Sequence, residues 1–428
     1  MSASALSPRS LRLPNGYESV RLGYVARLQN GLTVDAKRDV TGDVVTRPYL
    51  RVANVQAGSL DLESVTEITV PRGVARRSTL RPGDVLMTEG GDLDKLGRGT
   101  VWQGELDGCL HQNHIFAIRP DPQRLSGRFL AYVTQSLYGR SYFESTGTRT
   151  TNLASTNSSK IQSFPLPLPP PEEQRRIVDF LDAETARIDA LIDARQHQLP
   201  LLSARDQSVL DEVNSSSKEA QTPVKYLVDK VTSGPRGWGE FLSDEGTPFI
   251  RITNIPRRGI DLDLSDLAKV DAPRGAERQR TRTRAGDVLV SITADVGSVA
   301  VVAGAAVDGN VSQHVALLRP KQDKCDSRWL AYALKSPRAQ QVLAMNSYGG
   351  TKVGLGLADV ANLMVPRLPG DRQRSIAEGV DRKLQVTAQI RASITRQLAA
   401  LAERRQSLIT AAVTGQLDVT TARQVTVA

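Results

Sequence analysis

The chain has 428 residues, of which 40% are hydrophobic and 24% charged, and its formal net charge is +9. This length predicts two or three domains, and the ordinary composition argues against a largely disordered chain. Residues 1–16 lack the apolar core of a signal peptide, and no apolar run is long enough to span a bilayer. We therefore expect a cytoplasmic protein without membrane contact, for which the modest positive charge makes a polyanionic partner plausible.

The sequence contains an internal repeat with an offset of about 200 residues. PYLRVANV begins at Pro48 and PFIRITNI at Pro248, and HQNHIFAIRP at His111 corresponds to VSQHVALLRP at Val311. Within the first copy, strands are predicted over Pro48–Val55, Gly83–Thr88 and His114–Arg119, with counterparts in the second copy. Helices are predicted over Leu125–Tyr138 and Arg328–Ala344. Each copy is therefore expected to be an α+β domain.

A basic segment follows the early strands in both copies. In ERQRTRTRAGD of the second copy, every second residue from Arg278 to Arg284 is arginine. In an extended segment these side chains would share one face, suited to phosphates or guanine edges, although a solvated edge strand protected by charge is an equally open interpretation. The candidate DNA contacts of this type are Arg72, Arg76, Arg77, Arg81, Arg274, Arg278, Arg280, Arg282 and Arg284.

A loop with glycine and small hydroxyl residues follows each predicted helix, as STGTRTTN in the first copy and SYGGTKVG in the second. Such residues beside a cation permit close approach to a backbone phosphate, and an ordinary polar turn is the alternative. The candidate contacts here are Thr148, Arg149, Asn152, Thr351 and Lys352.

Other polar residues of the repeat are expected to be structural. Asn54 and Asn254 could recognise adenine, but their position in a predicted strand favours a structural hydrogen bond. His114 and His314 are interpreted as core or edge histidines. Cys109, His111 and His114 have a spacing that resembles part of a metal site, but no fourth ligand is evident and the second copy keeps only the last residue, so no zinc site is expected.

A proline block precedes a long amphipathic segment in each copy. PLPLPPPEEQRRI ends at Ile177 and PRLPGDRQRSI at Ile376, and apolar residues then recur at alternating steps of three and four. Each segment predicts a helix of about 40 residues, which is too long to bury its apolar stripe alone. We expect the two helices to form an antiparallel coiled coil, with a kink or break in the first helix at Pro200. The alternative is that each helix packs only on its own domain.

Catalytic motifs are missing from the sequence. There is no dinucleotide-binding glycine motif, no P-loop, no HExxH and no methyltransferase signature of the DPPY or NPPY type. Acid-x-lysine triplets at Asp35 and Asp381 are too short to indicate a nuclease. Catalysis by this chain alone is therefore not expected.

The proline blocks, the EEQRRI helix start and the RRQSLITAAVTGQLDV segment near the end of the second helix together resemble the DNA specificity subunit of Type I restriction-modification systems. The resemblance covers nearly the whole chain and implies two tandem target-recognition domains, each followed by a spacer helix. The implied boundaries are recognition domains at 1–170 and 224–369, helices at 171–214 and 370–414, a linker at 215–223 and a tail at 415–428.

The resemblance also implies the function and the partners. Each domain would recognise one half of a bipartite, asymmetric double-stranded DNA target, and the chain would act together with two modification (methyltransferase) subunits and with restriction subunits. S-adenosylmethionine, ATP and Mg²⁺ would bind those partners, with no cofactor on this chain. The alternatives are a stand-alone DNA methyltransferase or nuclease, and a coiled-coil repressor or scaffold.

Overall fold

The computed structural model describes residues 11–33, 42–56, 58–91, 96–97, 99–149, 154–214, 220–347 and 354–422. The chain divides into two compact units. Unit 1 comprises residues 1–194 and 397–428, and unit 2 comprises residues 195–396. Within the described ranges, no helix is both long and apolar enough to cross a membrane.

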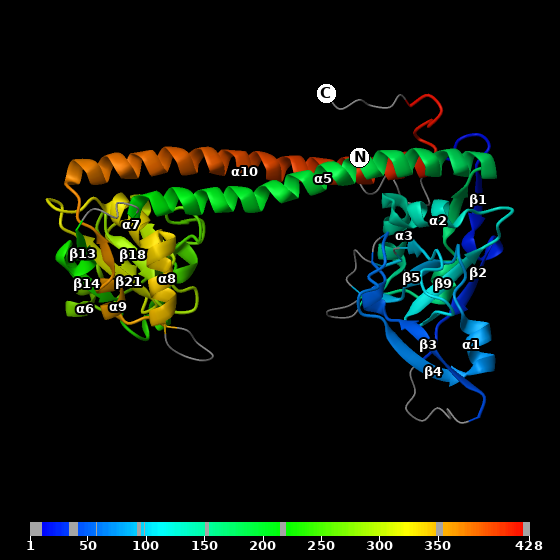
Figure 1. The fold of residues 1–428 in the computed structure, drawn as a ribbon, viewed down its shortest axis with the longest axis horizontal. Coiled ribbons are helices and arrows are strands. Elements are labelled where there is room, and N and C mark those ends of the chain that lie inside the picture. The colour runs from blue at the N-terminus through cyan, green and yellow to red at the C-terminus, as the bar shows by residue number, and fades with distance from the viewer. Residues whose placement is uncertain are drawn as a thin grey trace. The chain divides into compact units, whose positions relative to one another are not determined.

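Unit 1 is built on two main sheets, one antiparallel and one mixed, with helices beside them (Figure 1). The central sheet has the order β2-β9-β5-β7, formed by Ala26–Asn30, Ile115–Pro120, Val85–Thr88 and Gly99–Val101. A second sheet has the order β4-β3-β8, formed by Thr66–Pro71, Val44–Leu50 and Leu110–His111, in which β3 and β8 are parallel. Two small sheets contain β1 (Glu18–Arg21) with β12 (Pro165–Leu168), and β10 (Thr148–Arg149), β11 (Ala154–Ser155) and β6 (Gly90–Gly91).

Four short helices complete the globular part of unit 1: α1 (Arg72–Ser78), α2 (Gly127–Gln135), α3 (Leu137–Thr146) and α4 (Ser158–Gln162). The helix predicted over Leu125–Tyr138 is thus divided at Ser136. The side chain of this residue accepts a hydrogen bond from the Gly139 amide and begins a second helix, as serine commonly does at a helix start.

Unit 2 repeats this design. One sheet has the order β14-β21-β18-β19, formed by Val228–Ser233, Val315–Pro320, Val288–Ser291 and Val299–Val301. The other has the order β15-β17-β16-β20, formed by Leu242–Ser243, Ala268–Val270, Thr247–Ile250 and Asn310–Val311. Its helices are α6 (Ala276–Thr281), α7 (Ser327–Lys335), α8 (Pro337–Asn346) and α9 (Leu357–Ala361), and β13 (Gln221–Pro223) pairs with β22 (Met364–Pro366).

The predicted strands over Gly83–Thr88 and His114–Arg119 correspond to β5 and β9, while the strand predicted over Pro48–Val55 ends earlier, at Leu50. Residues Val52–Asn54 form a single 3-10 turn instead. The turn is stabilised because the Arg51 amide donates to the Asn54 side-chain oxygen at 2.8 Å. Arg251 and Asn254 repeat this contact at 2.9 Å in unit 2.

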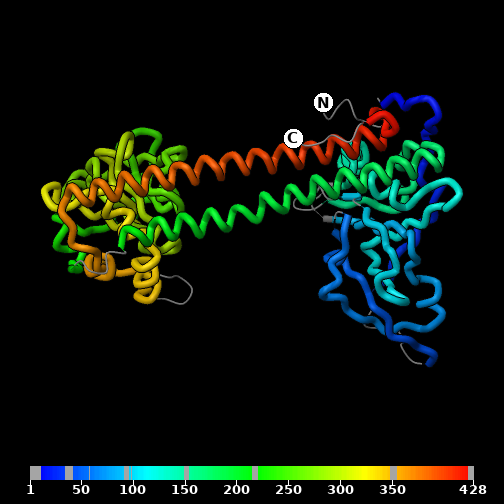
Figure 2. Tube along the Cα trace, turned by 45° about the horizontal axis from the view of Figure 1, so that its top comes forward, coloured from blue at the N-terminus to red at the C-terminus, as the bar shows by residue number. Residues whose placement is uncertain are grey.

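The two long helices are α5 (Pro171–Asn214) and α10 (Gly370–Val413), and each has 44 residues (Figure 2). A break at Pro200 is wrong, because α5 continues through this proline, whereas a kink there stays a prediction. Proline has no amide hydrogen, so this helix lacks one backbone hydrogen bond at Pro200.

Each unit takes one part of both helices into its core. In unit 1, Ile177 and Leu181 of α5 are buried in one cluster with Ile409 and Val413 of α10. In unit 2, the C-terminal part of α5 and the N-terminal part of α10 are buried together, through Val209, Leu210, Val213, Ala377 and Val380. The alternative in which each helix packs only on its own domain is therefore wrong.

Ion pairs join the helices within each unit. Arg405 of α10 contacts Asp189 of α5 at 2.8 Å in unit 1. In unit 2, Arg391 contacts Asp206 at 3.0 Å and Lys383 contacts Glu212. Residue numbers along α10 fall as those along α5 rise, so the helix segments of unit 2 are antiparallel.

Candidate nucleic-acid interface

In unit 1 the predicted basic residues lie on and just after α1. The buried Ala75 and Ser78 anchor this helix, and the arginines occupy its solvent side. Arg72 donates to Asp43 at 2.9 Å, a pair in which both side chains are more than half exposed. The guanidinium groups of Arg72, Arg76, Arg77 and Arg81 are accessible to a polyanion in unit 1.

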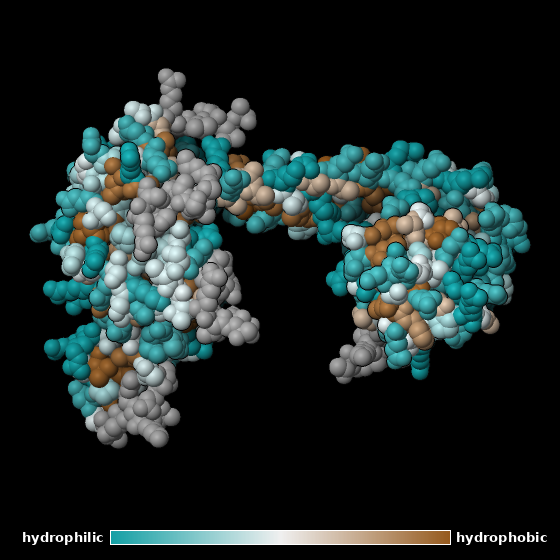
Figure 3. Space-filling model, turned by 180° about the vertical axis from the view of Figure 1, so that it is seen from behind, coloured by the Kyte–Doolittle hydropathy of each residue, from teal (hydrophilic) through white to brown (hydrophobic). Residues whose placement is uncertain are grey.

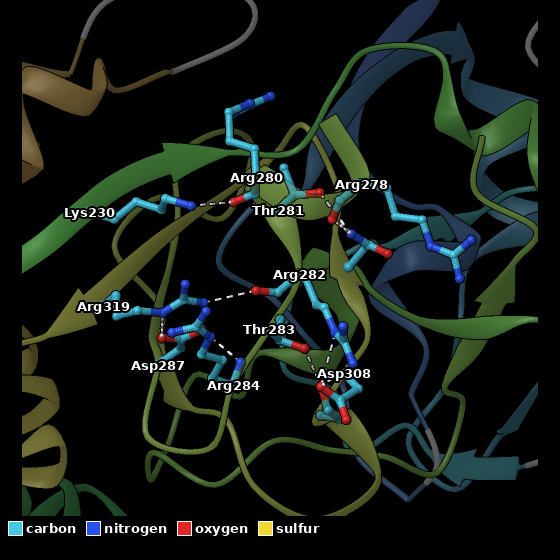
Figure 4. A network of polar contacts seen from close by, with 12 residues as sticks. Lys230, Arg278, Arg280, Thr281, Arg282, Thr283, Arg284, Asp287, Asp308 and Arg319 are labelled. Carbon is cyan, nitrogen blue, oxygen red and sulfur yellow. Dashed lines mark hydrogen bonds and ion pairs between the residues drawn. The ribbon is translucent and has the colours of Figure 1, made fainter. Parts of the chain in front are cut away.

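In unit 2 the prediction of an extended row of arginines is wrong for the first half of the row. Arg278 and Arg280 lie on the short helix α6, whereas Arg282 and Arg284 follow it in extended backbone (Figure 4). From Thr281 to Arg284 burial alternates, with the threonines inside and the arginines outside. The predicted shared face therefore applies to Arg282 and Arg284 alone.

The helical turn forms because the surrounding side chains satisfy its backbone. The Asn310 amide donates to the Arg278 carbonyl at 2.9 Å and to the Thr281 hydroxyl at 2.8 Å. The Thr281 hydroxyl donates to the Glu277 carbonyl one turn earlier at 2.9 Å. These partners satisfy carbonyls that a short helix otherwise leaves unpaired, and a period-two sequence pattern does not reveal them.

The arginines of unit 2 differ in the hydrogen bonds and ion pairs that they form with the rest of the protein. Arg280 donates to the Ser233 carbonyl at 2.9 Å and also contacts Thr232, so it joins α6 to β14. Arg282 is paired with Asp308 at 3.0 Å, and both side chains remain more than half exposed. Arg274 and Arg284 are exposed at the two ends of the segment.

The electrostatic field beside α6 is positive. Lys230 of β14 donates to the Arg280 carbonyl at 3.1 Å. Its pKa is lowered, first by burial and then by the charges of Arg319, Arg284 and Arg280. Concentrated positive charge of this kind attracts nucleic-acid phosphates.

A buried ion pair supports the basic segment in each unit, and the sequence analysis missed it. Arg319 contacts Asp287 through two bonds of 2.7 and 2.8 Å, and Asp287 also accepts from the Arg284 amide at 2.8 Å. In unit 1 Arg119 contacts Asp84 at 2.6 and 2.7 Å. The signal was present in the repeat, because both GDV and the arginine of IRP or LRP recur.

The glycine-loop candidates are only partly covered by the structure. Thr148 begins strand β10, is exposed, and accepts a hydrogen bond from the Lys160 ammonium at 2.8 Å. Arg149 lies in the same strand. Asn152, Thr351 and Lys352 lie outside the described residues.

Asn54 and Asn254 have the predicted structural role. The Asn54 amide donates to the Asp61 carbonyl at 2.9 Å, and the Asn254 amide donates to the Asp263 carbonyl at the same distance. Both residues are buried, so their amides stabilise the turn between strands and are not exposed to a DNA groove.

The histidines of the motif have protein partners. His114 contacts Glu89 at 2.6 Å, and His314 contacts Thr293 at 2.7 Å. The fully buried His111 donates to the Ile115 carbonyl at 2.9 Å and accepts from Gln29 at 3.3 Å. Burial lowers the pKa of His111 to about 4, so its ring is neutral near neutral pH.

Cys109 is also buried, and burial raises the pKa of its thiol to about 12. A metal ligand needs the thiolate, which this environment disfavours. In the ranges that the structure describes, no three or more His, Cys, Asp or Glu side chains are placed to hold a metal ion together.

Comparison with known proteins identifies the class. Residues 14–201 match the family model of the Type I restriction modification DNA specificity domain. The chain is 22% identical to the Escherichia coli Type I restriction enzyme EcoBI specificity subunit, over 95% of this chain and 87% of that protein. It is 24% identical to the EcoKI specificity subunit of Escherichia coli K12, over 95% and 90%. The chain is thus similar to Type I specificity subunits along nearly its whole length, which confirms the resemblance.

Solved structures share the fold. A chain from a study of complex assembly and conformational transition of the type I R-M system aligns with a TM-score of 0.78 and 22% identity, covering 95% of this chain and all of that one. The HsdS subunit from Thermoanaerobacter tengcongensis aligns with a TM-score of 0.58 and 22% identity, covering 95% of this chain and 98% of that one. These matches confirm the α+β class with two domains and long helices.

Proposed function

We propose that this chain is the non-catalytic DNA-recognition subunit of a Type I restriction-modification complex, in which each recognition domain binds one half of a bipartite, asymmetric target. Recognition domain 1 is assigned to residues 1–170 and recognition domain 2 to residues 224–369. The observation that carries the proposal is the duplicated domain with unlike basic segments, α1 in one copy and α6 with its extension in the other. Related domains with different contact surfaces suit two different half-sites.

The exposed and half-exposed arginines are proposed to bind phosphates and guanine edges. They are Arg72, Arg76, Arg77 and Arg81 in unit 1, and Arg274, Arg278, Arg282 and Arg284 in unit 2. Thr148, Arg149, Asn152, Thr351 and Lys352 are proposed as further contacts. Arg280 holds α6 on β14, so its effect on DNA binding is expected to be indirect.

Two modification subunits and restriction subunits are the proposed partners, in the cytoplasm. S-adenosylmethionine, ATP and Mg²⁺ serve the chemistry of those subunits, which this chain directs to its target. The stand-alone enzyme and the repressor are disfavoured because the family and the relatives are named for specificity subunits.

The helices α5 and α10 are proposed to form a coiled coil that sets the spacing between the half-sites. The test deletes one heptad from each helix between the ion pairs Asp189–Arg405 and Asp206–Arg391, removing residues 194–200 and 395–401. Seven residues shorten a helix by about 10 Å, or about three base pairs at ~3.4 Å each.

Sequencing of methylated sites, with the partner methyltransferase present, measures the outcome. The half-sites should keep their sequences while the gap between them contracts. Exchange of residues 1–168 for another recognition domain is the control and should change one half-site only. An unchanged gap with an altered half-site after the heptad deletion would show that the helices do not set the spacing.

A further inference from the structure

Unit 2 contains a cavity of about 840 Å³ between its helix pair and its globular domain. Its apolar wall comes from Leu210 of α5 and from Leu384, Ala388 and Ala392 of α10. The opposite side is formed by the loop Arg257–Gly259 and by Lys335 at the end of α7. This size lies within the range of about 300–1,000 Å³ typical of small-molecule sites.

The described residues that line the cavity carry a strong excess of positive charge. Five cations face one carboxylate, that of Asp206, and they are Arg257, Arg258, Lys335, Arg391 and Arg396. Arg391 is paired with Asp206 at 3.0 Å, and Arg257 is paired with Asp295 at 3.1 Å outside the lining. Arg258, Lys335 and Arg396 therefore leave an excess of positive charge at this partly open, largely apolar hollow, although Arg258 and Arg396 are exposed.

Lys335 is partly buried at the wall of this cavity. Its ammonium donates to the Pro256 carbonyl at 3.2 Å, which uses one of its three protons. Burial lowers the pKa of Lys335 to about 8, and the charge of Asp295 opposes this shift only in part. A desolvated ammonium at a cavity wall is stabilised when an anion enters.

The corresponding cavity of unit 1 has the opposite character. It measures about 420 Å³ and places Gly58 where unit 2 has Arg258, and Gln135 where unit 2 has Lys335. Its charged lining residues are Arg128, Arg405, Glu105, Asp182 and Asp189. The fold thus forms a hollow at this position in both repeats, but only that of unit 2 combines the larger volume with a cationic lining.

We infer that the cavity of unit 2 binds a nucleoside phosphate, with Arg258, Lys335 and Arg396 holding the phosphate groups and the Leu–Ala wall of α5 and α10 holding the ring. Several converging cations match the dense charge of a phosphate chain, because each can donate charge-assisted hydrogen bonds to its oxygens. The small side chains Ala388 and Ala392 leave room for a flat ring beside the helices. The surface of this unit seen from behind carries apolar patches separated by hydrophilic residues (Figure 3).

The test measures binding of ATP, AMP and inorganic phosphate to the full-length chain in complex with its modification subunits. The variant Lys335→Gln carries the residue that unit 1 has at the same position, so the fold should tolerate it, and hydrogen exchange checks this. Loss of one charge-assisted hydrogen bond should weaken ATP binding by about tenfold, and addition of Arg258→Gly should weaken it further. Lys269→Gln removes an equal charge at an exposed site of unit 2 and should leave ATP affinity unchanged.

The methylated sequences should be the same for all these variants, so the site is tested separately from DNA recognition. The inference is overturned if Lys335→Gln binds ATP like the unmodified chain, or if Lys269→Gln weakens binding equally. It is also overturned if inorganic phosphate competes as well as ATP, since the apolar wall would then contribute nothing. Binding of polyglutamate but not of ATP would assign the cavity to an acidic protein segment instead.

Discussion

The two units share an internal framework and differ at their surfaces. At the start of each long helix, a buried glutamine connects the helix to its domain: Gln174 accepts from the Ser126 amide at 2.8 Å, and Gln373 accepts from the Asp326 amide at 2.7 Å. Arg128 contacts Asp182 at 2.7 Å, and Arg328 contacts Asp381 at 2.6 Å. By contrast, the basic segments and the junction cavities differ between the repeats.

This contrast shows that the buried polar contacts serve the fold, whereas the exposed basic residues are free to differ for recognition. Buried polar groups need fixed partners, so both repeats retain the same hydrogen bonds at the helix junction. Exposed arginines carry no such constraint and can be rearranged without loss of the core. A duplicated scaffold can therefore present two unlike surfaces.

The largest expected effect comes from the shared ion pair beneath the basic segments. Asp287→Ala leaves the Arg319 guanidinium, whose side chain is 14% exposed, without its carboxylate. Breaking a buried pair typically costs about 3–5 kcal/mol of folding free energy. Asp84→Ala should cost less, because the Arg119 side chain is 27% exposed and water can reach it more easily.

Hydrogen exchange followed by mass spectrometry resolves the two units in this comparison. Asp308→Ala removes the exposed partner of Arg282 and serves as the control, with an expected cost below about 1 kcal/mol. Equal loss of protection from Asp287→Ala and Asp308→Ala would contradict a supporting role for the buried pair.

The second expected effect is a pH dependence of stability that differs between the two units. The pKa of His111 is lowered from 6.5 to about 4 by burial, whereas unit 2 has Val311 at this position. Between these two values the unfolded state binds a proton that the folded state does not, so unit 1 loses stability as the pH falls from 6.5 to about 4. The loss should be on the order of 3 kcal/mol.

His111→Val should reduce this pH dependence of unit 1, even if it lowers stability at neutral pH by removing the bonds to Ile115 and Gln29. Urea unfolding of unit 1, followed by Trp102 fluorescence in a variant with Trp238 and Trp329 replaced by phenylalanine, measures the slope between about pH 4.5 and about pH 7. If His111→Val leaves the slope unchanged, the pH dependence of unit 1 stability comes from other titratable groups.

The smallest effects concern single arginines at the proposed interface. Arg274→Ala with Arg284→Ala should reduce the salt dependence of DNA binding by about 0.9 for each phosphate that is no longer neutralised, because fewer counterions are released. Adding Arg278→Ala and Arg282→Ala should flatten it further. Arg280→Ala should instead loosen α6 on β14, with a smaller change of slope than the exposed arginines cause.

Binding of the assembled complex to its target at several salt concentrations measures these slopes. Gln279→Ala, on the exposed side of the same helix, controls for local disturbance. An unchanged slope after removal of Arg274, Arg278, Arg282 and Arg284 would mean that these residues are a solvated surface, as the alternative interpretation of the sequence holds.

The duplication, the α+β class and the two long helices follow from the amino-acid sequence alone. Strands such as β5 and β9 are short apolar runs beside turn residues, and the apolar stripes of α5 and α10 follow the helical period, so these elements depend on neighbouring residues alone. The resemblance to specificity subunits also rested on contiguous motifs.

Long-range packing, by contrast, decides which segments share a hydrophobic core and which polar side chains pair with one another. The helix of Ala276–Thr281 takes the place of half of the expected arginine row, and Asn310, distant in sequence, donates to its Arg278 carbonyl and Thr281 hydroxyl. The pairing of Arg319 with Asp287, the entry of both long helices into each core, and the cationic cavity around Lys335 likewise depend on residues far apart along the chain. Local periodicity carries no information about such contacts, because burial and charge compensation are set by packing.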